Sequence, residues 1–134
     1  MESSTKRSLL AIGAGLAVII VATTLVDIAL HVSGVFPPMD VPINDAQSLL
    51  ATAYRLVISI AGAWLTARLA PDKPMRHAML LGYVGTVLGA LGVAATWDKG
   101  LGPAWYPIAL TVLAVPQCWV GGRLFVWWAG RRGA

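Results

Sequence analysis

The sequence is poor in cysteine and in histidine, and these shortages narrow the chemistry that it can support. Cys118 is the only cysteine, which excludes an internal disulfide and a cysteine-ligated metal cluster. Of the two histidines, His31 lies near the end of the first apolar run and His77 in the basic segment after the second, at the opposite depth, so they cannot ligate one metal or haem iron together. We therefore expect no metal and no cofactor.

Catalytic and nucleic-acid-binding patterns are also missing. The chain contains no glycine-rich phosphate loop and no serine, histidine and aspartate in the order and turn context of a hydrolase. It is basic, with a formal net charge of +4, yet its lysines and arginines lie mostly between or beyond the apolar stretches and are not interleaved with aromatic residues on a polar face. We therefore expect neither an enzyme nor a nucleic-acid-binding protein.

Apolar residues are what the chain has in abundance. They make up 57% of its 134 residues against 12% charged residues, more than a soluble domain of this length could bury. Four runs reach the length that crosses a bilayer, and segments rich in proline or glycine separate them. The sequence predicts an all-α, multi-pass membrane protein, a single domain over 1–134 with a compact antiparallel four-helix bundle spanning 8–36, 46–69, 78–96 and 104–128.

The first run has a second interpretation. The letters MESSTKR followed by SLLAIGAGLAVIIV resemble the basic and apolar regions of a secretory signal. The apolar run is longer than such a region, and no clear small-x-small cleavage site follows it. We therefore predict a retained transmembrane helix.

Basic residues are distributed unevenly around the four runs. The side that carries both ends of the chain and the second connection has seven of them, and the opposite side has one. Because cytoplasmic segments of membrane proteins are enriched in lysine and arginine, both termini are predicted to be cytoplasmic. These residues are Lys6, Arg7, Arg68, Lys73, Arg76, Arg131 and Arg132 on the first side and Lys99 on the second.

Small residues recur at helical spacing along each run. Such stripes let helices approach closely in a bilayer, so they predict the bundle's contact faces, a seam between copies of the chain, or room for a ligand or lipid. The first run has its predicted stripe at Gly13, Ala17, Thr24, Asp27 and His31, and the third at Gly82, Gly85, Gly89 and Gly92.

The stretch LVDIALHVSG places Asp27 and His31 one helical turn apart inside apolar sequence. Asp27 lies nine residues before Phe36 and Arg55 ten residues after Asp45, so both lie about 13 to 15 Å from the same membrane boundary at 1.5 Å per residue. An unpaired charge at this depth is costly, which predicts an ion pair between Asp27 and Arg55. His31 is expected to join it opposite Thr52.

Two interpretations of this group stay open. In the first, the pair is a structural clamp, with Thr24, Thr52, Tyr54 and His31 satisfying the remaining donors and acceptors, in a non-catalytic accessory or assembly protein. In the second, Asp27, His31 and Arg55 line the route of a small oligomeric transporter or channel. The expected partners are the lipid bilayer, other copies of the chain or a larger membrane complex.

Two segments carry a resemblance to known proteins. TARLAPDKPMRHAMLLG and LGPAWYPIALTVLAVPQCWVGGRL resemble the small four-helix inner-membrane proteins of bacteria over the last three runs, which implies a bacterial inner membrane and no particular activity. In size and helix number the chain is also similar to the small multidrug-resistance transporters. Their membrane-embedded acid would match Asp27, although theirs is a glutamate nearer the start of the first helix and has no arginine partner.

Overall fold

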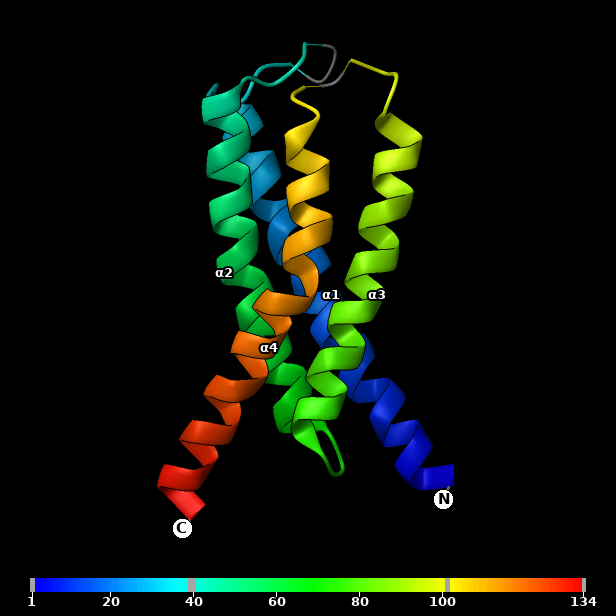
Figure 1. Ribbon diagram of the computed structural model, residues 1–134. Helices are drawn as coiled ribbons and strands as arrows, with labels where there is room; N and C mark the ends of the chain where they lie inside the picture. The colour runs from blue at the N-terminus through cyan, green and yellow to red at the C-terminus, as the bar shows by residue number, and fades with distance from the viewer. Residues whose placement is uncertain (1, 39–40, 101, 134) are drawn as a thin grey trace.

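The computed structural model describes residues 2–38, 41–100 and 102–133, and its described part contains four helices and no strand. Figure 1 shows the helices side by side, each running opposite to the next along the chain. Both chain ends lie at the same end of the bundle as the short α2–α3 connection, here called the terminal end. The opposite end is called the loop end. The helices are α1 (Glu2–Val32), α2 (Asp45–Leu69), α3 (Pro74–Thr96) and α4 (Trp105–Gly133).

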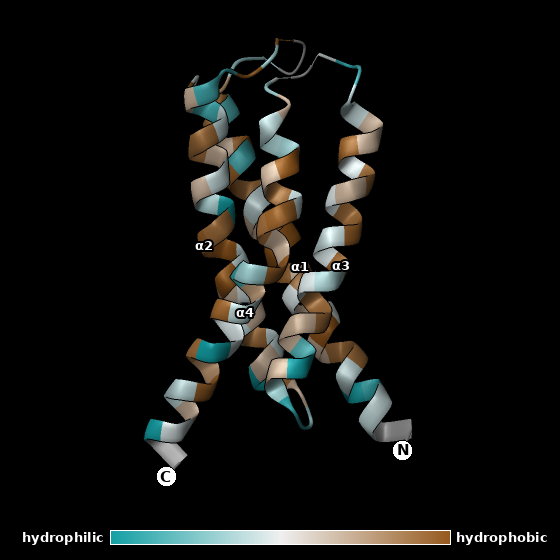
Figure 2. Ribbon diagram, in the orientation of Figure 1, coloured by the Kyte–Doolittle hydropathy of each residue, from teal (hydrophilic) through white to brown (hydrophobic). Residues whose placement is uncertain are grey.

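Each helix is long and apolar enough to cross a membrane, which confirms the predicted all-α, multi-pass fold. The spanning segments are Ser4–Val32, Asp45–Leu69, Pro74–Thr96 and Trp105–Arg131. Figure 2 shows hydrophobic residues through the middle of the helices and hydrophilic residues mostly towards their ends, as expected where the middle meets hydrocarbon.

Local signals set the helix ends and correct several predicted boundaries. The first helix ends at Val32 rather than at residue 36, because the chain turns at Gly34 with a φ of +85° and the Phe36 amide donates back to the Leu30 carbonyl. The third begins four residues earlier than predicted, with Pro74 in its first turn, where a missing N–H costs nothing. The fourth continues to Gly133.

Close packing depends on glycines at the helix crossings. Gly15 of α1 lies against Gly62 and Thr66 of α2, and Gly121 of α4 lies against Ala63 of α2. In each case an added Cβ atom would collide with the neighbouring helix. Such close approach maximises van der Waals contact, which drives helix association in a bilayer.

The third helix packs on α4 through three of its four predicted glycines. A Cβ atom on Gly82, Gly85 or Gly89 would meet α4 at 3.3 Å or less. The prediction that Gly92 packs in the same way is wrong, because a Cβ atom there would meet nothing within 4 Å. The helices diverge before this turn.

The contact stripe predicted on the first helix is right at Asp27, which contacts α2, but wrong at Gly13, Ala17 and Thr24. Gly13 has open space around it and Ala17 and Thr24 are exposed, whereas the buried positions include Ala11 and Thr23. Small residues occur on more than one face of this helix, so their spacing alone did not select the face in contact. Among the described residues, α1 packs on α2 and briefly on α3 but does not pack on α4.

Candidate intramembrane site

The two charged residues predicted to pair lie in contact between α1 and α2. Arg55 Nη2 donates to Asp27 Oδ2 at 2.6 Å, and each side chain is 29% exposed. Their charges are opposite and their contact is direct, so each compensates the other inside the hydrophobic span. The antiparallel α1–α2 hairpin produces this contact because it brings residues of equal depth together.

Two tyrosines complete the ion pair, and we call Asp27, Tyr54, Arg55 and Tyr106 the charge cluster. The Tyr54 hydroxyl donates to Asp27 Oδ1. Tyr106, from the first turn of α4, lies close enough to Arg55 to interact with it electrostatically. The cluster therefore joins three helices rather than two.

Sequence reasoning did not place Tyr106 in this group, because an aromatic residue at the end of an apolar run is typical of the membrane boundary. Its position in the first turn of a helix that follows a Gly-Pro turn was a usable signal. The long arginine side chain extends from Arg55 towards the loop end, where this turn lies.

The other predicted members lie near the cluster but bond elsewhere. His31 Nδ1 lies 2.7 Å from the Asp27 backbone carbonyl, and its ring edge packs on Phe36 at 5.4 Å between centroids. Thr52 donates to the Ser48 carbonyl of its own helix, 2.8 Å away, and no bond from it to His31 is present. The prediction that Thr24 satisfies the pair is wrong, because its side chain is exposed on the other face of α1.

Arg55 also lines a half-open space of about 270 Å³ between all four helices, which we call the central cavity. It lies where α1 and α4 fail to pack. Its polar lining consists of Arg55 and Ser59 from α2, Thr23 from α1 and Gln117 from α4. The remaining lining is mostly aliphatic or glycine.

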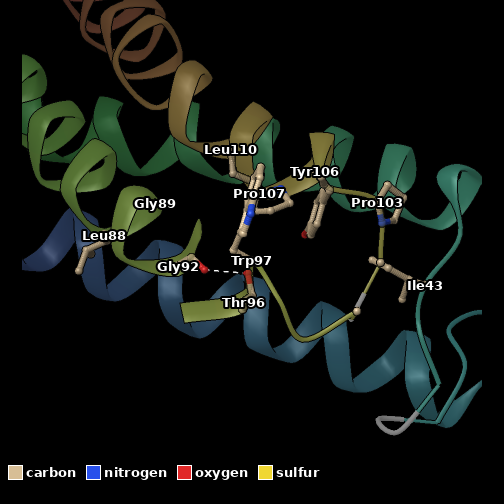
Figure 3. Close-up of a pocket in the computed structure, with 13 residues that line it drawn as sticks. Ile43, Leu88, Gly89, Gly92, Thr96, Trp97, Pro103, Tyr106, Pro107 and Leu110 are labelled. Carbon is tan, nitrogen blue, oxygen red and sulfur yellow. Dashed lines mark hydrogen bonds between the residues drawn. The ribbon is translucent and has the colours of Figure 1, made fainter. Parts of the chain in front are cut away.

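A second space of about 360 Å³, the loop-end cavity, lies between α3, α4 and their connection (Figure 3). Figure 3 shows Gly92 and Thr96 on one side and Tyr106, Pro107 and Leu110 on the other. Leu88, Gly89 and Leu110 line both cavities, so the two spaces adjoin.

At the terminal end, His77 makes a contact that sequence reasoning missed. It was interpreted as part of a basic loop, but its side chain is buried, and Nε2 lies 2.7 Å from Ser8 Oγ of α1. Nδ1 lies 3.0 Å from the Lys73 carbonyl. This histidine ties α3 to α1 where these two helices approach.

The described residues contain no group of three or more histidine, cysteine or acidic side chains arranged to hold a metal. Comparison of the chain with protein-family models, curated proteins and solved structures finds no match. The function must therefore be argued from the geometry of the cluster and the cavities.

Proposed function

We propose that this is a non-catalytic membrane protein, an accessory or assembly component, in which the charge cluster clamps the bundle. The observation that carries the proposal is that both charges of the ion pair are compensated by residues of the chain itself. The Asp27 carboxylate accepts hydrogen bonds from Arg55 and Tyr54, and Tyr106 interacts electrostatically with Arg55. A charged group whose partners come from its own chain favours a role in holding helices together.

The energetic argument concerns what would happen without the partners. Removing one member of a buried ion pair leaves an uncompensated charge and costs about 3–5 kcal/mol. In a bilayer no water replaces the lost partner, so α1 and α2 would separate or the arginine would move towards the boundary. The clamp therefore fixes how α1, α2 and α4 assemble.

The uneven basic residues and the resemblance to bacterial proteins support a location in the bacterial inner membrane with both termini in the cytoplasm. In this orientation, the terminal end of the bundle faces the cytoplasm. Partners would be copies of the chain or a larger membrane complex, because most of the helix surface is apolar and exposed.

A charge swap tests the clamp. We expect Asp27→Arg and Arg55→Asp each to reduce the membrane abundance of folded protein strongly, and the double variant to restore much of it. The tyrosine hydroxyls can follow the swap, because each both donates and accepts. Lys99→Asp, in the exposed α3–α4 connection, is the matched control and should keep normal abundance.

A second candidate function, a small oligomeric transporter or channel using Asp27, His31 and Arg55, is favoured by one observation. Arg55 lines the central cavity as well as the ion pair. The two candidates differ in Asp27→Asn and Arg55→Gln. If these neutralised variants stay folded and abundant but abolish a transport phenotype, and the swap fails, the clamp proposal is rejected in favour of transport.

A further inference from the structure

The central cavity contains polar groups that the chain does not satisfy. Gln117 forms no hydrogen bond with any residue that the structure describes, although it lines this cavity in the middle of α4. Ser59, only 5% exposed, lines the same cavity and likewise has no hydrogen-bond partner in the described chain. Arg55 Nε, beside them, is buried and unpaired in that same part of the protein.

Unpaired amide and hydroxyl groups are unfavourable in this environment. Moving such a group from water into an apolar medium without a hydrogen bond carries a large desolvation cost. Helices in lipid can avoid this cost by turning polar side chains towards partners, as Tyr54 and Tyr106 do in the charge cluster. Gln117 of α4 and Ser59 of α2 instead both line the central cavity, where a molecule with hydrogen-bonding atoms could satisfy them.

The charge balance of the cavity selects an uncharged ligand. Arg55 is already neutralised by Asp27. An anion bound here would compete with Asp27 and leave a net negative charge within the span, which is unfavourable at this depth. A carbonyl or hydroxyl group matches the amide of Gln117 and the hydroxyl of Ser59 without that penalty.

The loop-end cavity, which adjoins the central cavity, indicates the chemistry of the rest of the ligand. The loop-end cavity is lined mainly by apolar groups, and it meets the central cavity at Leu88, Gly89 and Leu110. With volumes of about 270 and 360 Å³, the two adjoining spaces are of the size that small-molecule sites occupy. Gly92 keeps the loop-end cavity open, because α3 has no side chain there (Figure 3).

We propose that the two cavities together bind one uncharged amphiphile. Its carbonyl- or hydroxyl-bearing head contacts Gln117 and Ser59 in the central cavity, and its hydrocarbon tail occupies the loop-end cavity. Arg55 and Tyr106 of the charge cluster also line the two cavities, but the head is bound by Gln117 and Ser59, neither of which bonds to the ion pair.

The test is photolabelling of the purified full chain with a monoacylglycerol that carries a diazirine in its acyl chain. Peptide mapping should find adducts concentrated at Leu88 and Leu110, above the level at lipid-exposed Val112. Gln117→Leu keeps the volume of the side chain and removes its hydrogen bonds. It should reduce labelling of the two leucines about fivefold, the scale of one lost hydrogen bond.

A matched pair of glycine variants tests the tail position. Gly92→Phe fills the loop-end cavity, and Gly13→Phe adds the same ring to an exposed face of α1. A Cβ atom meets nothing within 4 Å at either position, so both variants should fold, which their thermal unfolding will check. Gly92→Phe should abolish labelling of Leu88 and Leu110, whereas Gly13→Phe should leave it unchanged.

Two results would overturn the proposal. Equal labelling of Leu88, Leu110 and Val112, unaffected by Gln117→Leu and Gly92→Phe, would show that no amphiphile occupies the cavities. Equal or stronger labelling of the two leucines by a diazirine fatty acid of the same chain length would show that the head is anionic.

Discussion

Arg55 determines much of the arrangement around it. Its guanidinium is always charged and presents several donors in one plane, so it can interact with more than one polar group. In this chain the acceptor is the Asp27 carboxylate of α1, and Tyr106 of α4 interacts electrostatically with the same guanidinium. One side chain on α2 thus positions two neighbouring helices.

The contribution of Tyr106 can be measured separately. We expect Tyr106→Phe to remove the polar interaction of the hydroxyl with the Arg55 guanidinium, which lowers the free energy of unfolding by about 0.5–1.5 kcal/mol. Thermal unfolding of the purified protein checks this. Tyr83→Phe is the control, because that tyrosine is 54% exposed on α3 and should show no shift. An unchanged midpoint in Tyr106→Phe would mean that the α4 contact contributes nothing to the clamp.

At the residue scale, the depth of a side chain in the membrane could be predicted from the sequence, but the residues that it contacts could be predicted only in part. Counting residues from the ends of the apolar runs placed Asp27 and Arg55 at one level, and the structure brings them into contact. The same count said nothing about Tyr106, because its contact depends on which way α4 faces. The prediction for Thr24 fails for the same reason, because one residue along a helix is a rotation of about 100°.

At the scale of the element, helix faces were harder to predict than helix lengths. The residues of α1 that face its neighbours recur every four positions, namely Ala11, Gly15, Ile19, Thr23 and Asp27. A row of this spacing runs obliquely over the helix surface, and helices that pack along it cross at an angle. The predicted stripe assumed a face parallel to the axis.

The glycine contacts allow a direct test on α4. A Cβ atom on Gly121 would lie 2.7 Å from Ala63 Cβ and collide with the α2 backbone, whereas one on Gly130 meets nothing. We expect Gly121→Ala to destabilise the bundle by about 1–3 kcal/mol, the usual cost of overpacking. Gly130→Ala should be neutral or slightly stabilising, since alanine favours helix.

Thermal unfolding in the same detergent would compare the two variants. Equal midpoints for Gly121→Ala and Gly130→Ala would contradict the close α2–α4 crossing. A specific loss in Gly121→Ala alone would show that backbone proximity, rather than helix propensity, governs this position.

At the scale of the whole molecule, the main feature is that the bundle is packed incompletely. Of the helix pairs in the described chain, α1 and α4 are the pair that do not pack together. Both cavities follow from the way the bundle opens, the central one beside α1 and the loop-end one where α3 separates from α4. Water would satisfy Gln117 and Ser59 on a soluble surface, but in the central cavity they need another hydrogen-bond partner.

The orientation in the membrane is a prediction for the molecule as a whole. In a Cys118→Ala background, a membrane-impermeant thiol reagent added from outside should label Val41→Cys and Lys99→Cys, which lie in the two loop-end connections. Asp72→Cys, in the terminal-end turn, should react only after the membrane is opened. The reverse pattern would place the termini outside the cytoplasm.

The sequence by itself determined the number of helices, their approximate spans and the common depth of Asp27 and Arg55. These properties depend on distance along the chain, which length and hydropathy record. Only the tertiary structure decided which face of each helix is buried, which tyrosine reaches Arg55 and where Gln117 points. In a lipid solvent the outside of a helix is as apolar as its contacts, so hydropathy carries little information about rotation, and packing of the small residues decides it.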